Sequence, residues 1–588
     1  MVNLLVEGTL PGLSSPGDRA HYHVAAMPTK SLLALERLRL VFDSAAAQRK
    51  LTLLQKLARR HLRSAPSVLR LHEMLCFMRA YPDDAAVLTA AQAMLEGFAR
   101  RADLRAHCAA LADSGIAGTS IHYRFFAGQA WWLAERWPAQ LRLDRSDADT
   151  EARVALAMPS LLTPVERQAL IERHKPGYAA LDHLRGVKES DAVFLLRRTA
   201  SMPGNGFTRE AFVDAMDASM VLEPGPGTPS RSVAVFAPAP VDFRSVAPSR
   251  GRPDLRREIG RAPYGLRRLA VPDAEALADL ARAAMVTRAR SLEAFSFADA
   301  RDGWLVGDAD GLAFGLLGVV PERRHALASY YGGLILRNGV PVGYLQSDIV
   351  GRSAALSFNT FETFRGGEAA YLFARWLAAL QHVFGCTSFS IDPYQLGKNN
   401  DEALDSGAWW FYAKLGFAPR DAWTRTLVRA ERARMQRRPS HRSSRHTLTQ
   451  LAERHLFFDL DTAQPQPLVS MPELGMHCGA ALSELAGSDR ERAIDTMSDA
   501  LLRESGLTRM PRLSTQQREA WHRLVPVLWV MDRSAWSQSE RRALVDLARA
   551  KAGRSERDFI RAFLAHPRFG AALQEWARRG RGTRLGGP

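Results

Sequence analysis

A glycine-bearing turn, Phe364–Ala370, stands between two apolar runs of the chain. Gly366 and Gly367 carry no Cβ, so their backbone N–H groups can approach a phosphate closely. The apolar pattern that follows predicts a helix over Glu368–Phe384, whose positive dipole end also favours a phosphate. Arg365 can add a charge-assisted hydrogen bond. The types and order of these residues therefore indicate a phosphate-binding loop.

Two carboxylates stand near the ends of the apolar runs that we expect to be strands. Glu362 lies near the end of Ala354–Phe364, and Asp392 ends Thr387–Asp392. A carboxylate in such a place can take a proton from a nucleophile, directly or through a water molecule. Each residue also has a structural interpretation, because Glu362 can simply be solvated and an Asp before a proline commonly starts a turn. Both interpretations stay open for both residues.

The elements that must position these residues follow one another as hairpin, strand, turn, helix, strand and short helix. Asn338-Gly339 separates the apolar runs Leu334–Arg337 and Val340–Leu345. Asn-Gly in that setting is a strong hairpin signal, because both turn positions need a positive φ. The last element, Ala408–Leu415, is predicted to be a short helix that Gly416 closes.

Three of these segments resemble the GNAT-type N-acyltransferase superfamily. The string Arg365-Gly-Gly-Glu-Ala-Ala370 is similar to the family's pyrophosphate loop, Gln/Arg-x-x-Gly-x-Gly/Ala. The string Ala408-Trp-Trp-Phe-Tyr-Ala-Lys-Leu-Gly-Phe417 resembles the family's Ala-x-x-Phe-Tyr-x-Lys-Leu-Gly-Phe segment, and Asn338–Tyr344 looks like its central hairpin. The resemblance covers only residues 325–420 or so.

The resemblance implies a mixed, V-splayed sheet in which acetyl-CoA or another acyl-CoA lies between two parallel strands. Those strands would be Ala354–Phe364 and Thr387–Asp392. It implies that Tyr412 protonates the departing CoA thiolate, and that an amine attacks the thioester directly without a metal. It also implies that backbone amides of one loop cradle the pyrophosphate, namely those of Gly366, Gly367, Glu368, Ala369 and Ala370, with Arg365 beside them.

The sequence departs from the family pattern at two positions. Glu368 stands where the loop usually has glycine, and a carboxylate beside a pyrophosphate is repulsive. Asp405 stands where the family often has asparagine. These departures favour an alternative in which the domain is a non-catalytic scaffold or sensor whose helical flanks bind a partner.

The charge of the chain supports a third alternative. The formal net charge is +17, and eight arginines lie between Arg425 and Arg445. Such a balance attracts phosphates and nucleic acids. A nucleic-acid-binding protein that uses this stretch and the tail Arg578–Arg584 therefore stays open, although no stacking motif or helix-turn-helix signature accompanies the charge.

Other features narrow the class of protein. The four cysteines form no CxxC pair, so neither a zinc ribbon nor a redox motif is supported and reduced thiols are expected. The first residues lack a signal-peptide pattern, and no run reaches the roughly 18 apolar residues of a membrane span. We therefore expect a cytoplasmic protein.

Composition divides the chain into four regions. We expect an all-helical region over 1–222, a Pro/Gly-rich linker or lead-in over 223–253, a GNAT-like α/β domain over 254–430, and a basic helical region over 431–588 that ends in an Arg/Gly tail. Within the α/β domain, Trp304–Val306 and Leu312–Val319 are further strand-like runs.

Overall fold

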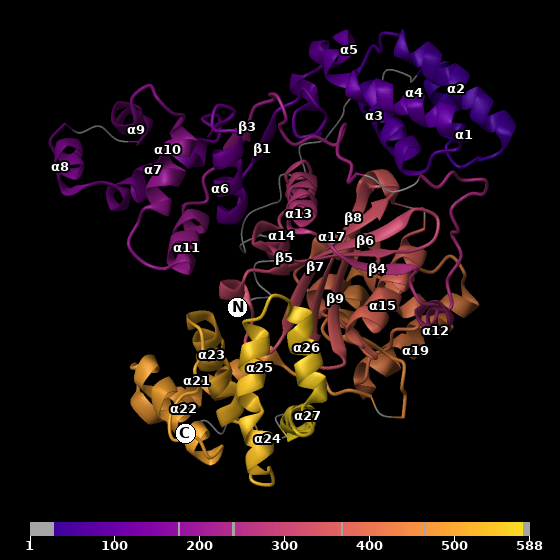
Figure 1. Cartoon of the computed structure of the whole chain (residues 1–588). Helices are drawn as coiled ribbons and strands as arrows, with labels where there is room; N and C mark the ends of the chain where they lie inside the picture. Colours follow the sequence, from indigo (N-terminus) through magenta and orange to yellow (C-terminus); the bar gives the residue numbers. More distant parts are fainter. Residues whose placement is uncertain (1–28, 174–176, 238–240, 366–367, 464, 580–588) are drawn as a thin grey trace. The chain divides into compact units, whose positions relative to one another are not determined.

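Apolar runs in the middle of the chain form one mixed eight-stranded sheet, seen in a computed structural model that describes all residues except 1–28, 174–176, 238–240, 366–367, 464 and 580–588 (Figure 1). The strand order is β11-β10-β9-β8-β7-β6-β5-β4. The strands are β4 (Gly265–Arg268), β5 (Ala298–Gly307), β6 (Leu312–Val319), β7 (Ser329–Arg337), β8 (Val340–Val350), β9 (Ser353–Thr360), β10 (Ser388–Ile391) and β11 (Leu456–Asp459). The prediction of a central mixed α/β sheet with helical flanks is confirmed.

The predicted hairpin is β7–β8, and its turn is Asn338-Gly339. Asn338 has φ +47° and Gly339 has φ +75°, as the two-residue turn requires. The Asn338 side chain fixes the turn further, since its Nδ2 donates to the carbonyl oxygens of Ala80 at 3.0 Å and Asp242 at 3.2 Å. Asn338 thus adopts the backbone conformation of the turn and also stabilises it through side-chain hydrogen bonds.

The helix α15 (Ala369–Phe384) connects β9 to β10 and makes them a parallel pair. Its apolar residues are buried, including Leu372, Phe373 and Trp376, and Gly385 ends it in the left-handed region with φ +76°. The predicted helix and its glycine stop are confirmed. A crossover helix between parallel neighbours is what a β-α-β unit requires.

The strand predicted over Ala354–Phe364 is shorter in the structure. β9 ends at Thr360, and Glu362–Phe364 form the 3-10 turn η7. The N–H of Phe364 donates to the carbonyl oxygen of Phe361 at 2.8 Å, which curls the chain toward α15. Since Phe361 and Phe364 are both buried, the apolar pattern continues past the end of the strand.

The prediction that residues 1–222 are all helical is wrong. Three short strands, β1 (Ile121–Tyr123), β2 (Leu141–Leu143) and β3 (Met220–Leu222), form a second sheet in the order β1-β3-β2. Three residues are too few for an alternating pattern to stand out from the helices around them. Those helices are α1 (Lys30–Leu38), α2 (Ser44–Ala58), α3 (Ala65–Ala80), α4 (Ala85–Glu96), α5 (Ala102–Ala106), α6 (Ala127–Arg136), α7 (Ala148–Ala157), α8 (Pro164–Arg173), α9 (Gly177–Arg185), α10 (Asp191–Ala200) and α11 (Gly206–Met216).

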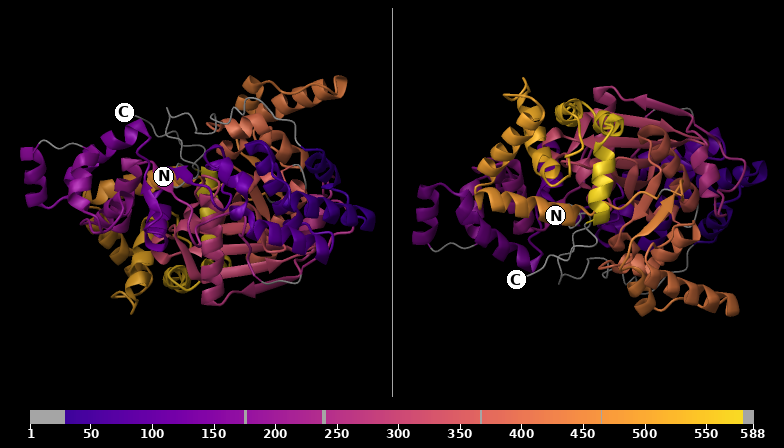
Figure 2. Two further views of the ribbon diagram at one scale, coloured as in Figure 1. Left: turned by 90° about the horizontal axis from the view of Figure 1, so that it is seen from above. Right: turned by 90° about the horizontal axis from the view of Figure 1, so that it is seen from below.

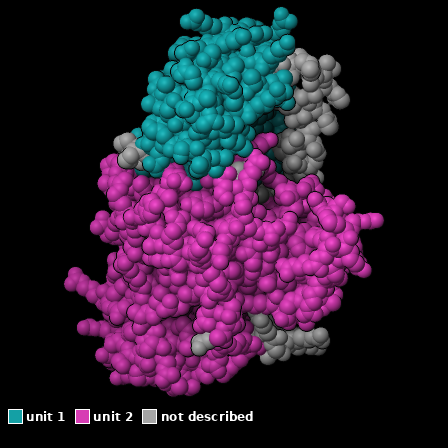
Figure 3. Space-filling view, turned by 90° about the vertical axis from the view of Figure 1, so that its right-hand side faces the viewer, with its two compact units in different colours: residues 1–247, 275–297, 336–342 teal, residues 248–274, 298–335, 343–588 magenta. Residues whose placement is uncertain are grey.

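The chain divides into two compact units, coloured in Figure 3. Unit 1 comprises residues 1–247, 275–297 and 336–342, and unit 2 comprises 248–274, 298–335 and 343–588. Unit 1 also takes in most of α13 (Val271–Val286) and the short α14 (Glu293–Ser296). The C-terminal helices thus belong to the same unit as most of the sheet, and not to a region of their own over 431–588.

The helices of unit 2 other than α15 come before the sheet, after β10 and at the C-terminal end. They are α12 (Leu255–Gly260), α16 (Pro393–Leu396), α17 (Asp401–Ser406), α18 (Ala408–Lys414), α19 (Ala422–Arg437), α20 (Arg445–Leu451), α21 (Met471–Ala486), α22 (Arg490–Glu504), α23 (Thr515–Trp529), α24 (Gln538–Arg542), α25 (Leu544–Lys551), α26 (Glu556–Ala565) and α27 (Phe569–Arg579). None of the helices in the described part of the chain is long and apolar enough to cross a membrane.

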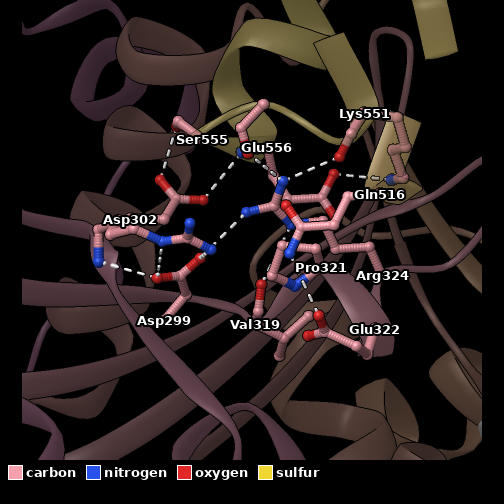
Figure 4. A network of polar contacts seen from close by, with 12 residues as sticks. Asp299, Asp302, Val319, Pro321, Glu322, Arg324, Gln516, Lys551, Ser555 and Glu556 are labelled. Atoms are coloured by element: carbon pink, nitrogen blue, oxygen red, sulfur yellow. Dashed lines mark hydrogen bonds and ion pairs between the residues drawn. The ribbon is translucent and has the colours of Figure 1, made fainter. Parts of the chain in front are cut away.

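Buried polar groups join α25 and α26 to the sheet (Figure 4). Asp302 of β5 accepts hydrogen bonds from the Ser555 hydroxyl at 2.6 Å and the Glu556 N–H at 2.9 Å. The fully buried Arg324 donates to the carbonyl oxygens of Lys551 at 2.8 Å and Gly553 at 2.6 Å. A buried charge is tolerated only when it is paired and hydrogen-bonded, so these contacts fix the helices to the sheet.

Candidate functional site

The parallel strands β9 and β10 pair over only part of the length of β9. The ladder runs from Ser353↔Ser388 to Leu356↔Ile391, where β10 ends. β9 continues to Thr360, and residues 357–360 pair only with β8 on the other side. Alternate peptide groups of a strand point to opposite neighbours. Some N–H and C=O groups of residues 357–360 therefore point to the edge of β9 at which β10 no longer pairs.

Asp392 follows β10 directly and turns the chain away from β9. Its Oδ1 accepts hydrogen bonds from the N–H groups of Tyr394 at 2.8 Å and Gln395 at 3.2 Å, which makes it the N-cap of α16. Burial raises the pKa of the Asp392 carboxyl, against the opposing effect of these two bonds. Asp392 therefore ends the ladder and also places a carboxyl with a perturbed pKa at the point where the strands part.

Tyr412 of α18 lies near the same carboxyl. The residue is buried, and burial together with the charge of Asp392 raises the pKa of its phenol above 10.0. The phenol is therefore fully protonated at neutral pH and can donate a proton. The sequence named both residues, and the structure brings them within electrostatic reach of each other.

An aromatic cluster surrounds Tyr412 and reaches the unpaired end of β9. The ring of Tyr412 lies 5.4 Å from that of Phe373 of α15 and 5.1 Å from that of Phe411. Phe358 of β9 lies 5.2 Å from Phe373 and stacks on Phe411 with ring centroids 6.2 Å apart. Offset and edge-to-face contacts of this kind hold rings in fixed positions. The sequence interpretation missed Phe358 and Phe411, and the alternation of Leu356, Phe358 and Thr360 was the signal for the first of them.

Glu362 and Arg365 lie in the connection between β9 and α15. Glu362 is exposed in η7, at the end of β9. The Arg365 guanidinium donates to Glu402 at 2.7 Å and to the carbonyl oxygen of Thr360 at 3.3 Å. The charge of Arg365 is thus partly neutralised by Glu402, and a phosphate would have to compete with that carboxylate.

The predicted phosphate loop is described only in part. Gly366 and Gly367 lie outside the described residues. Glu368 is 4% exposed and stands at the N-cap position of α15, which Ala369 and Ala370 begin. The helix N-terminus is therefore where the prediction placed it, and a buried carboxylate stands beside it.

The second departure from the family pattern, Asp405, is held by an ion pair. Arg445 contacts both Asp401 and Asp405 of α17, the latter at 2.6 Å. Both carboxylates are exposed, so this contact contributes little to stability. Through Arg445, Asp405 holds the segment before α18, and among the described residues it makes no hydrogen bond or ion pair with Tyr412 or Asp392.

The remaining predictions concern thiols, metals and the tail. Cys76, Cys108, Cys386 and Cys478 are all free thiols. No group of three or more His, Cys, Asp or Glu side chains that could hold a metal ion is found among the residues that the structure covers. Of the basic tail, Arg578 and Arg579 end α27, whereas residues 580–588 lie outside the described part.

Comparisons with known proteins find no relative of this chain. No family model, no curated protein and no solved structure matches the chain. The functional interpretation therefore depends on the residues and geometry given above.

Proposed function

We propose that unit 2 transfers an acyl group from acyl-CoA to an amine by direct attack, in the manner of the GNAT-type acyltransferases that residues 325–420 resemble. The observation that carries the proposal is the early end of the β9–β10 ladder at Leu356 and Ile391. Beyond it, the unpaired edge of β9 offers peptide groups that can bind the amide-rich arm of CoA as a third strand would.

The chemical step assigns a role to each group near the end of the β9–β10 ladder. The amine nitrogen attacks the thioester carbonyl carbon, and N–H groups of residues 357–360 stabilise the negative charge that forms on its oxygen. As the C–S bond breaks, Tyr412 gives its proton to the departing thiolate. The proton that the amine loses passes to Asp392 or Glu362, directly or through water, and Tyr412 regains a proton from solvent.

The direct test is release of free CoA thiol from acetyl-CoA in the presence of amines of different kinds, among them a polyamine, a lysine side chain and a peptide N-terminus. Amine-dependent thiol release with a matching amide product supports the proposal. If CoA stabilises the protein against heat, by about 2.7 kcal/mol at 100 times its dissociation constant, but no amine gives release, the scaffold alternative is favoured. If CoA neither binds nor reacts, the proposal fails.

Asp392→Asn tests the proton acceptor. Asparagine keeps an oxygen for the Tyr394 and Gln395 N–H groups, so α16 stays capped while the carboxylate is lost. Because burial raises the pKa of Asp392 above 3.8, the base is lost as the pH falls through that raised value. The acceptor amine should be one of low basicity, such as an aniline. With it, kcat/KM of the native chain should decrease on the acid side of the pH profile, with a midpoint above the pKa range of an ordinary Asp.

The Asn variant should lose about 10²-fold in kcat/KM and should lack this acid limb. An unchanged acid limb in Asp392→Asn would assign the base elsewhere. Glu362→Gln is then the next variant to measure, since Glu362 is the other carboxylate at the end of the ladder.

Glu368→Gln tests whether the buried carboxylate opposes cofactor binding. A like charge near a phosphate is repulsive by an amount on the order of 1–2 kcal/mol at an effective dielectric constant of about 20. The variant should therefore bind CoA about tenfold more tightly in a calorimetric titration. The matched control is Glu453→Gln, which removes the same charge from an exposed ion pair with Lys398 at 2.6 Å. Equal affinity in the native chain and both variants would show that Glu368 does not face the phosphates.

A further inference from the structure

The helix α19 and the turn that follows it carry an unusually one-sided charge. Between Arg425 and Arg445 there are eight arginines, and Glu431 is the one acidic residue. Six of the arginines are exposed and pair with no carboxylate among the residues described, and we call them the arginine surface: Arg425, Arg429, Arg432, Arg437, Arg438 and Arg442. In both views of Figure 2 the orange helix of this part of the chain extends outward from its surroundings.

Glu431, an almost fully buried residue of α19, holds the arginine surface in place. The Glu431 carboxylate accepts hydrogen bonds from Ser443 at 2.5 Å and His441 at 3.1 Å, and it pairs with Arg434 at 2.6 Å. Ser443 in turn accepts a bond from the indole of Trp410 at 3.0 Å. The segment after α19 is thus folded back onto the helix and tied to α18, so its arginines are positioned before any ligand binds.

Three of these arginines form one stripe. Arg425, Arg429 and Arg432 are four and three residues apart, so they lie within about 60° of one another around the helix and span about 10 Å along it. One nucleic-acid strand presents a phosphate about every 3.4 Å of helix axis, so the stripe matches about three phosphates. The planar guanidinium forms paired hydrogen bonds with phosphate oxygens, which a lysine cannot do.

The apolar side chains of α19 argue against the other anionic partners. Val428 is buried and Leu427 is half-buried, and the exposed Trp423 lies on the side of the helix turned away from Arg425, Arg429 and Arg432. The arginine stripe itself therefore presents no apolar face to enter a lipid surface. The stripe itself contains no aromatic or aliphatic anchor of the kind that dominates protein–protein interfaces. Binding by charge alone, along a regular line of phosphates, is what such a surface can supply.

We propose that the arginine surface binds the phosphate backbone of a nucleic acid. This inference does not rest on acyl transfer, and it stands if unit 2 has no such activity. The phosphate chemistry is common to RNA and DNA, so the ligand class is a nucleic-acid strand and the choice between the two sources is made by experiment.

The test uses the full chain and fluorescence anisotropy with three labelled probes: a 20-nucleotide single-stranded RNA, the DNA of the same sequence, and the corresponding DNA duplex. The test variant is Arg425→Gln/Arg429→Gln/Arg432→Gln. The control variant, Arg492→Gln/Arg503→Gln/Arg518→Gln, removes the same charge from exposed positions on α22 and α23. Circular dichroism and thermal unfolding establish that both variants keep the fold.

For a single strand each phosphate contact contributes about 0.7 to the slope of log K against log salt concentration. The test variant should therefore show a slope smaller by about 2 and an affinity lower by about 100-fold at 0.1 M salt. The control variant should stay within about threefold of the native chain. The probe that binds most tightly identifies RNA or DNA as the source of the phosphates.

Two results would overturn the proposal. One is an equal loss of affinity in the test and control variants, which would make the binding a property of the total charge. The other is displacement of the bound RNA by an equal charge concentration of polyglutamate with higher affinity, which would assign the surface to an acidic protein.

Discussion

Replacing Tyr412 by phenylalanine is expected to lower kcat for acyl transfer by about 10²-fold or more while changing the dissociation constant of CoA by less than about twofold. Burial and the charge of Asp392 raise the pKa of the Tyr412 phenol, so the native residue carries its proton at neutral pH and is a weaker acid toward the thiolate than an ordinary tyrosine. Phenylalanine keeps the ring and its contacts with Phe373 and Phe417, so the aromatic cluster should stay intact.

The matched control for this variant is Tyr178→Phe in α9 of unit 1. Burial raises the pKa of Tyr178 to about 12, and its buried hydroxyl has no hydrogen-bond partner among the described residues. The control should leave kcat unchanged. If Tyr412→Phe retains full kcat, or if it loses CoA affinity as much as turnover, Tyr412 is not the proton donor and its role is packing.

Replacing Lys551 by methionine is expected to lower the free energy of unfolding by about 3–5 kcal/mol, because it leaves a buried carboxylate without its cation. The Lys551 ammonium donates to Glu556 and to the carbonyl oxygen of Ala328, both at 2.7 Å, and Ser329 donates to the same Glu556 oxygen at 2.9 Å. Burial lowers the pKa of Lys551 to about 8 and raises that of Glu556.

The pH dependence of this loss has a definite sign. Glu556 has a raised pKa in the folded chain, so it binds its proton more tightly folded than unfolded, and protonation favours the folded state. The deficit of Lys551→Met relative to the native chain should therefore be largest above the raised pKa of Glu556 and shrink as the pH falls through it. Denaturant unfolding of both chains at a series of pH values below the pKa of Lys551, about 8, measures this change.

The double variant Lys551→Met/Glu556→Met is the control, because it removes the stranded charge. Replacing a whole buried ion pair by apolar groups is often close to neutral, so most of the lost stability should return. If the double variant is as unstable as the sum of the two single variants, the pair does not interact as the geometry indicates.

Local patterns in the sequence predict the middle of the fold well. The strand predicted over Leu312–Val319 has the same bounds as β6, and the helix after the loop ends at Gly385 as expected. Asn338-Gly339 forms the predicted turn, since its backbone preference is set by the two residues themselves. In each of these cases the signal is contained in a few neighbouring residues.

Long-range contacts could not be predicted in the same way. The Glu556 N–H donates to Asp302, 254 residues earlier in the chain, and no periodic pattern marks either residue as a partner of the other. The three-residue strands β1, β2 and β3 were missed because their pairing is decided by residues about 80 to 100 positions away. The attachment of the C-terminal helices to the sheet was missed for the same reason.

The candidate site could be predicted from the sequence only in part. The resemblance to acyltransferase motifs named Tyr412, whereas Asp392 was named by its place at the end of an expected strand. The structure places the two within electrostatic reach of each other. The point at which β10 leaves β9 depends on the cap that Asp392 forms with Tyr394 and Gln395, which the sequence interpretation treated only as one of two alternatives. The roles of these residues in acyl transfer stay predictions.

The most direct test of the central claim is amide hydrogen exchange of β9 and β10 with and without saturating CoA. If the pantetheine arm lies along the unpaired edge of β9, amides within residues 357–360 should exchange more slowly in the complex, while those of the paired stretch 353–356 change little. Unchanged exchange in residues 357–360 at millimolar CoA, or protection confined to other parts of the chain, would contradict the claim.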